Sequence, residues 1–165
     1  MYDGAKMDKD TIEQFVTNSK RVGNANTLIS KNEFLASFMQ DDYEYVYIPA
    51  FNYYKKILID KNGIKKAIVE SNLAIAETGT VVIDNNDETL RRSTSLAEEL
   101  NIVVLSSSIV SFLEDSNELL NNLTKKDHAY ITFITGASRT ADIELVLAMG
   151  VHGPLRVNII IITDA

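Results

Sequence analysis

The sequence predicts a single α/β domain in which a mostly parallel sheet carries helices on both faces, giving three layers. Short apolar segments recur along the chain and alternate with helical or loop segments, and parallel neighbours require such crossover connections. Several of these segments are apolar throughout, which is typical of strands buried on both faces. Because 165 residues is the length of one ordinary domain, we expect residues 1–165 to form one unit.

The expected strands lie in the middle and at the end of the chain. A first strand signal covers residues 44–48 and ends at Pro49, and a weaker one covers residues 56–60. Five more apolar strands are expected at residues 73–76, 81–83, 102–105, 130–134 and 157–162. We expect the last three to be central and parallel because of their continuous apolar character.

Helical spacing of apolar side chains appears in the first forty residues and again in the second half of the chain. Residues 8–20 and 32–40 show it on either side of a polar segment, 23–30, so residues 1–40 are expected to form a helical N-terminal arm. Residues 109–123 give the clearest amphipathic pattern. A further helix is expected at residues 140–149, ended by Gly150 and followed by Pro154.

Composition excludes several classes of function. The chain has no cysteine, so it can form no disulfide, hold no iron–sulfur cluster through thiolates and use no cysteine nucleophile. A net charge of −7 argues against a nucleic-acid-binding protein that neutralises phosphates. No apolar run is long enough to span a membrane and the start lacks the apolar core of a signal peptide, so a cytoplasmic location is expected.

One candidate ligand loop, the second of two in chain order, follows the expected strand at residues 130–134. Its sequence reads Gly136, Ala137, Ser138, Arg139, Thr140, Ala141 and Asp142, and it leads into an expected helix. A glycine turn at a helix start presents backbone N–H groups at the positive end of the helix dipole. With two hydroxyls and the planar cation of Arg139 added, the loop suits a phosphate or carboxylate. The alternative is that Ser138 or Thr140 only caps the helix and Asp142 favours its first turn.

The other candidate loop, the first in chain order, joins the expected strands at residues 73–76 and 81–83. It consists of Glu77, Thr78, Gly79 and Thr80, and it combines a carboxylate with hydroxyl and amide donors. The alternative, a hairpin turn with glycine at a positive φ, is favoured by these four residues alone. Because ligands in open α/β sheets bind beyond the carboxyl ends of strands, we expect the two loops to meet at one end of the sheet.

Three other sites have weaker support. Residues 136–140 approach the G-x-S-x-G nucleophile elbow, but the last glycine is missing and neither histidine can be placed near Ser138. The only histidines, His128 and His152, lack metal-ligand spacing, so no metal or other cofactor is expected. Arg92, beside Arg91, could reach an anion, although such a pair close to acidic residues is usually a solvated helix face.

Four motifs taken together resemble the LUD domain family. They are AIAETGT at residues 74–80, the pair at 91–92, GASRTADIE at 136–144 and GVHGP at 150–154. The resemblance covers roughly residues 60 to 162. It implies a fold similar to that of the ribose-phosphate isomerase, glucosamine-phosphate deaminase and coenzyme A transferase superfamily. The chain departs from the family at Ala137 and Ala97, where proline is common, and at Asn101, near a frequent histidine.

The resemblance also implies a function, because the family includes proteins linked to bacterial oxidation of L-lactate. Those proteins work beside an iron–sulfur protein and a second LUD-containing protein. We therefore expect this chain to bind a small anionic metabolite as a subunit or accessory protein of such a system, with Arg139 holding the anion and Glu77 orienting it or acting as a base. One alternative is a self-contained enzyme on a sugar phosphate or coenzyme A ester, with Glu77 as base or nucleophile. Another is a structural subunit without chemistry, and a homo-oligomer stays open.

Overall fold

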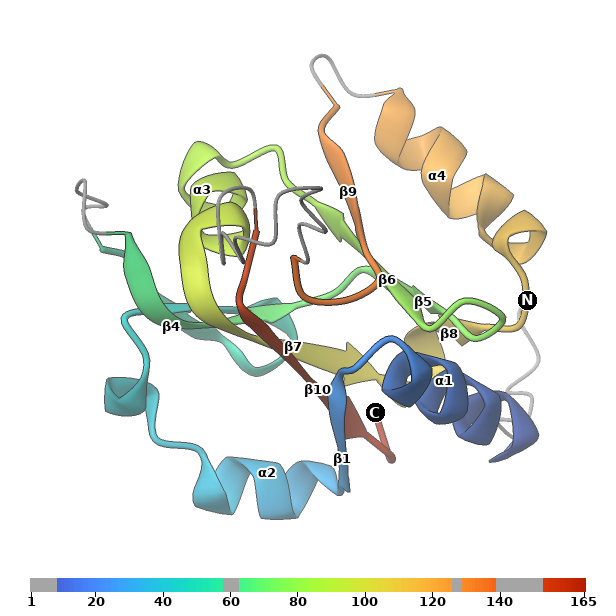
Figure 1. Cartoon of the computed structure of the whole chain (residues 1–165), viewed down its shortest axis with the longest axis horizontal. Helices are drawn as coiled ribbons and strands as arrows, with labels where there is room; N and C mark the ends of the chain where they lie inside the picture. The colour runs from blue at the N-terminus through green and yellow to red at the C-terminus, as the bar shows by residue number, and fades with distance from the viewer. Residues whose placement is uncertain (1–8, 58–62, 126–128, 139–152) are drawn as a thin grey trace, which may run out of the picture.

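The main sheet consists mostly of parallel strands, in the order β1-β10-β7-β4-β2-β3 (Figure 1). The computed structural model describes residues 9–57, 63–125, 129–138 and 153–165. The strands of this main sheet are β1 (Ala25–Ile29), β2 (Tyr45–Ile48), β3 (Tyr53–Lys55), β4 (Ile64–Glu70), β7 (Ala97–Leu105) and β10 (Arg156–Ile162). Only β3 is antiparallel to its neighbour in this sheet. The predicted mostly parallel α/β sheet is confirmed, and so are the central parallel strands at residues 102–105 and 157–162.

A smaller second sheet has the order β8-β5-β6-β9. Its strands are β5 (Leu73–Ile75), β6 (Thr80–Asp84), β8 (Ile109–Val110) and β9 (Ile131–Ile134). Because β5 and β6 pair antiparallel, the hairpin alternative for residues 77–80 is confirmed. The prediction that residues 130–134 form a central parallel strand is wrong, since β9 pairs antiparallel with β6 at the end of this sheet. A short apolar run does not determine the strand's partner, and Phe133 within it is 49% exposed.

Four helices are described: α1 (Lys9–Arg21), α2 (Lys31–Ser37), α3 (Glu88–Leu96) and α4 (Asn117–Thr124). Short 3-10 turns occur at Gln40–Asp42, Pro49–Phe51, Ser106–Ser108 and Leu113–Ser116. The predicted helix at residues 109–123 is wrong at its start, because the first two residues form β8 beside β5 and the helix begins at Asn117. The helix predicted at residues 140–149 lies outside the described residues.

The N-terminal segment contains a strand that the sequence pattern did not indicate. Residues 23–30 were expected to be a polar connection between two helices, whereas Ala25–Ile29 form β1 and pair with β10. Strand β1 has a described neighbour on one side only, so most of its side chains stay exposed and show no buried pattern. The weak strand signal at residues 56–60 is displaced, since the strand is Tyr53–Lys55; residues 58–60 lie outside the description.

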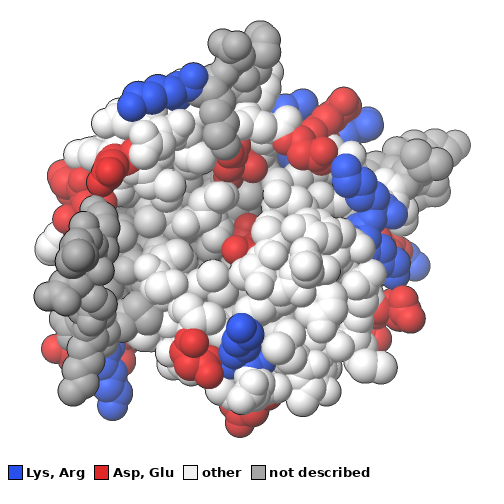
Figure 2. Space-filling view, turned by 180° about the vertical axis from the view of Figure 1, so that it is seen from behind, with Lys and Arg blue, Asp and Glu red and all other residues white. Residues whose placement is uncertain are grey.

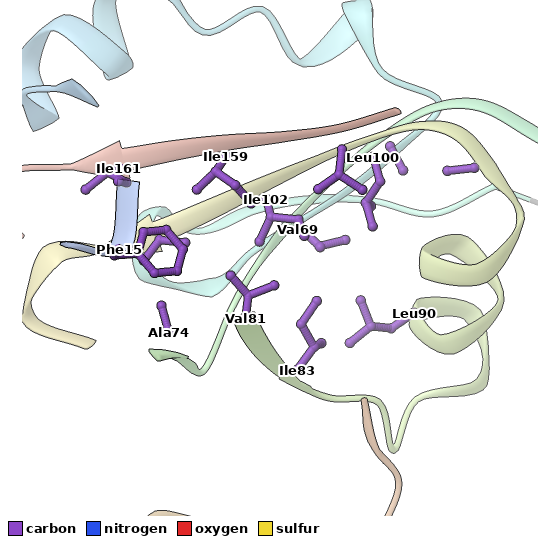
Figure 3. Close-up of a cluster of buried hydrophobic side chains, with 14 of the residues drawn as sticks. Phe15, Val69, Ala74, Val81, Ile83, Leu90, Leu100, Ile102, Ile159 and Ile161 are labelled. Carbon is purple, nitrogen blue, oxygen red and sulfur yellow. The ribbon is translucent and has the colours of Figure 1, made fainter. Parts of the chain in front are cut away.

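Each face of the main sheet is covered by a different set of elements. On one face α2 packs over β2, β4, β7 and β10 through Phe34, Val46, Ile68 and Val103. The opposite face packs against α1, α3 and the second sheet, and Figure 3 shows Phe15, Val81, Ile83 and Leu90 directed toward the main-sheet side chains. Leu119 and Leu120 of α4 cover the outer face of the second sheet. The second sheet is therefore buried between the main sheet and α4.

Candidate functional site

The two candidate loops meet at one end of the second sheet. Antiparallel pairing of β6 with β9 places Val81 opposite Ile134, so the start of one strand lies beside the end of the other. The Thr80 and Thr135 hydroxyl oxygens are 2.9 Å apart and form a hydrogen bond. Thr135 directly precedes the second loop, so the predicted proximity is confirmed for the described part of that loop, residues 136–138.

The end of the fold at which the loops meet differs from the prediction. Ser138 N–H donates to the carbonyl of Pro154 (2.9 Å), just before β10 begins. Leu155 N–H donates to the carbonyl of Glu98 near the start of β7. The second loop thus lies at the amino ends of the main-sheet strands, whereas we had expected carboxyl ends, because the loop follows a strand of the second sheet.

Helix α1 holds the first loop (Figure 1). Asn18 Nδ2 donates to the carbonyl of Ala76 (2.8 Å) and to that of Glu77 (3.0 Å). Gly79 has φ +66, and a Cβ built on it would lie 2.7 Å from the carbonyl carbon of Asn18 and 2.8 Å from the Cα of Ser19. Only a glycine allows the turn to approach the helix backbone this closely.

Asn24 holds the second loop from the same segment. Its Nδ2 donates to the carbonyl of Thr135 (2.8 Å) and to the hydroxyl of Ser19 (3.1 Å). Its side-chain oxygen is buried and has no hydrogen-bond partner within the described structure. A Cβ on Gly136 would lie 3.1 Å from the carbonyl oxygen of Val22. Sequence reasoning missed Asn18 and Asn24, because polar side chains in a helix and a connection resemble solvated residues.

A cleft of about 230 Å³ opens between α3, β9 and the second loop. It is lined by Thr94, Ser95, Thr132, Phe133, Ile134, Thr135, Gly136, Ser138, Gly153 and Pro154. We call it the hydroxyl cleft, because half of its lining residues carry a hydroxyl group. Gly153 and Ser138 lie close together in this lining, since a Cβ on Gly153 would lie 3.1 Å from Cβ of Ser138. Hydroxyl groups and exposed backbone amides are suitable partners for a small polar ligand.

Asn85 supports the hydroxyl cleft from behind. It is 0% exposed, and its Nδ2 donates to the hydroxyl oxygens of Thr132 (2.6 Å) and Thr94 (3.2 Å). Thr94 in turn donates to the carbonyl of Arg91 (2.9 Å). Because Thr132 accepts from Asn85, its own hydrogen is left for donation elsewhere. Sequence reasoning did not single out Asn85, although it follows β6 directly.

The remaining predicted site residues of the first loop do not line the hydroxyl cleft. Glu77 is exposed, and its Oε1 accepts a hydrogen bond from the backbone N–H of Leu113 (2.9 Å). Thr78 is also exposed at the tip of the turn. This contact gives Glu77 a role in holding the start of a 3-10 turn, independent of any ligand.

The arginine pair of α3 is split between two contacts. Arg92 is exposed and pairs with Glu88 (3.7 Å) one turn earlier, as on a solvated helix face. Arg91 stacks over the ring of Tyr130 at 4.3 Å from its centroid. Arg139, Thr140 and Asp142 lie outside the described residues. Among the described residues no group of three or more histidine, aspartate or glutamate side chains is arranged to hold a metal ion.

The molecular surface shows charges of both signs. On the face seen in Figure 2, Lys and Arg side chains are interspersed with Asp and Glu around the margin, while the middle is mostly uncharged. Among the described helices none is both long and apolar enough to cross a bilayer.

The fold and the motifs agree with a family assignment. The family model of the LUD domain matches residues 55–162. The chain belongs to the LUD domain family. This match spans both candidate loops and the whole of the hydroxyl cleft, whereas α1 and β1, which hold the loops, precede it.

Proteins similar to this chain carry a common name. It is 38% identical over 100 residues to Lactate utilization protein C 1 of Bacillus mycoides, covering 59% of this chain and 43% of the relative. It is 34% identical over 116 residues to Lactate utilization protein C of Bacillus subtilis, covering 63% and 47%. The chain thus matches less than half the length of these relatives. A crystal structure of a DUF162 family protein from Deinococcus radiodurans has the same fold, with TM-score 0.68, 20% identity and coverage of 93% of this chain and 97% of that one.

Proposed function

We propose that this LUD-domain chain binds a small carboxylate, such as lactate, in the hydroxyl cleft and acts in a bacterial lactate-utilisation system. The observation that carries the proposal is the concentration of hydroxyl groups in a cleft of about 230 Å³. This volume is below that of typical pockets for drug-sized ligands, roughly 300 Å³ and more, and suits a metabolite of a few carbon atoms. The names of the relatives support the pathway.

The proposed ligand contacts follow from the lining. Thr132 donates its hydroxyl hydrogen to a carboxylate oxygen, since Asn85 already occupies the acceptor side of that hydroxyl. Ser138 adds a second hydroxyl from the glycine loop. Arg139 follows in sequence, and we assign it the charge-neutralising contact, because a guanidinium matches a carboxylate in a bidentate manner. Gly136, Thr140 and Asp142 complete the proposed loop.

The proposed role is that of a subunit rather than an independent catalyst. The chain has no cysteine, so an iron–sulfur cluster for lactate oxidation would have to be held by a partner protein. We therefore propose an iron–sulfur protein and a second LUD-containing protein as partners. The alternative of a self-contained enzyme with Glu77 as base or nucleophile has less support, because Glu77 lies outside the cleft lining and caps Leu113.

Isothermal titration of the full chain with L-lactate, pyruvate, inorganic phosphate and a coenzyme A ester tests this proposal. We expect saturable binding of the hydroxy acid. Thr132→Val removes one hydroxyl while keeping the shape of the side chain, and it should weaken binding about tenfold, the value of one charge-assisted hydrogen bond. Thr27→Val, on the exposed edge strand β1, is the matched control and should bind as the parent does. Equal affinity of the parent and Thr132→Val would exclude the hydroxyl cleft as the site.

A further inference from the structure

A second cleft lies beside the N-terminal cap of α3, between the helix and strands β2 and β3. It encloses about 270 Å³ and is lined by Tyr45, Val46, Tyr47, Tyr54, Lys56 and Asp87. We call it the tyrosine cleft. None of its lining residues is shared with the hydroxyl cleft, and neither the proposed function nor the family motifs assign it a role.

The walls of the tyrosine cleft are aromatic. The rings of Tyr47 and Tyr54 lie edge to face, with centroids 5.8 Å apart and planes at 68°. Tyr45 is 1% exposed and contributes a buried third ring. Aromatic ring faces carry negative electrostatic potential and attract ammonium groups placed over them within about 6 Å of the centroid.

The charged groups that line the cleft are Lys56 and Asp87, which pair with each other, and Glu70 and Asp84 lie outside the lining. Burial raises the pKa of Tyr47, and Tyr54, Glu70, Asp87 and Asp84 raise it further, so the phenol stays neutral across the physiological range. Burial also raises the pKa of Tyr45, with Asp87 adding to the effect. Asp87 is thus the carboxylate of the lining that can pair with a cationic occupant beside the aromatic rings.

Lys56 shows where such a cation would bind. Its ammonium group lies 3.5 Å from Oδ2 of Asp87 at the cleft, and 68% of its side chain is exposed. Exposed ion pairs of this kind contribute little stability, so the ammonium of Lys56 can leave at small cost. A ligand with a weakly hydrated cationic head would contact the rings of Tyr47 and Tyr54 and would take the place of the Lys56 ammonium beside Asp87.

We infer that the tyrosine cleft binds a small organic cation, whose ammonium head lies against Tyr47 and Tyr54 and beside Asp87 in place of Lys56. The cation is a quaternary or tertiary ammonium compound, because such groups have low hydration and a large apolar surface for the rings. This site is independent of the proposed carboxylate site, so failure of either one leaves the other in place.

Choline is the probe, and 3,3-dimethylbutan-1-ol, which has the same shape without the charge, is the matched ligand control. Binding is measured by isothermal titration of the full chain, because only three of its seven tyrosines line the cleft and tyrosine fluorescence would not report on the cleft alone. We expect saturable binding of choline and binding of the neutral alcohol at least about fivefold weaker. Equal binding of both compounds, or no saturable binding of choline at millimolar concentration, would overturn the inference.

Three variants locate the cation, each checked for folding by circular dichroism. Tyr54→Leu, at a side chain that is 50% exposed, should weaken choline binding about fivefold, while Tyr130→Leu, at a ring that contacts Arg91 and does not line the cleft, should leave it unchanged. Asp87→Asn preserves a helix-capping side chain and should also weaken binding. Lys56→Met removes the competing ammonium and should strengthen it. Unchanged affinity in Tyr54→Leu, or weaker binding in Lys56→Met, would refute the placement.

Discussion

Replacing Gly79 by alanine should separate the N-terminal helix from the hairpin turn that it holds. The new Cβ would overlap the backbone of Asn18 and Ser19, which cannot rotate away as a side chain could. Alanine at φ +66 costs about 1 kcal/mol, overpacking against the helix costs about 1–3 kcal/mol, and each lost hydrogen bond of Asn18 costs about 1 kcal/mol. Because these costs arise together and Asn18 makes two such hydrogen bonds, we expect a total loss of about 4–6 kcal/mol in the free energy of unfolding.

Gly63→Ala is the matched control for this prediction. Gly63 also has a positive φ, +75, but a Cβ there meets only the carbonyl oxygen of Leu96, at 3.2 Å. Urea unfolding followed by circular dichroism should show a loss of about 1–2 kcal/mol for this control. In a double variant with Asn18→Ala, Gly79→Ala should cost less than it does alone, since both remove the same contacts. If Gly79→Ala destabilises no more than Gly63→Ala, α1 does not hold the turn as described.

Three further predictions concern single side chains. Asn85→Ala should lower the free energy of unfolding by about 2–3 kcal/mol and weaken lactate binding by releasing Thr132, as unfolding and calorimetric titration would show. The backbone N–H of Leu90 holds the pKa of Asp87 below its ordinary value. The ionised Asp87 carboxylate therefore stabilises the fold above pH of about 3.9, and this stabilisation is lost as the pH falls further. Acid unfolding of Asp87→Asn should lack this pH-dependent loss. Glu77→Gln keeps an acceptor for Leu113, so both stability and lactate affinity should stay near the parent values, whereas a base role would show as lost turnover.

The elements that the sequence predicted well are those whose residues are buried on both faces. Strands β7 and β10 carry runs of β-branched side chains that pack on both faces, so their apolar pattern does not depend on which neighbour they find. Strand β1 could not be predicted in this way, because its exposed edge position tolerates polar residues. Ile109 and Phe112 fitted a helical stripe, yet Ile109 lies in β8 and pairs with Ala74 of β5. This pairing joins segments distant in sequence, and a local periodicity contains no information about it.

The candidate site shows the same division between local and long-range causes. The glycine loop and the hairpin were visible in the sequence because turns require particular residues. The position of the glycine loop near the amino ends of β7 and β10 was not, since it depends on the antiparallel pairing of β6 with β9. In an open parallel sheet whose strands are joined only by helices, the loop that follows each strand lies at the carboxyl end of the sheet. Here the glycine loop follows β9 of the second sheet, and the hydrogen bond from Asn24 to Thr135 holds this loop beside the start of β1. The position of the glycine loop in this chain is therefore set by the second sheet and by the N-terminal segment that precedes the matched residues 55–162, so variants at Asn18 and Asn24 should affect the cleft as directly as variants of its lining.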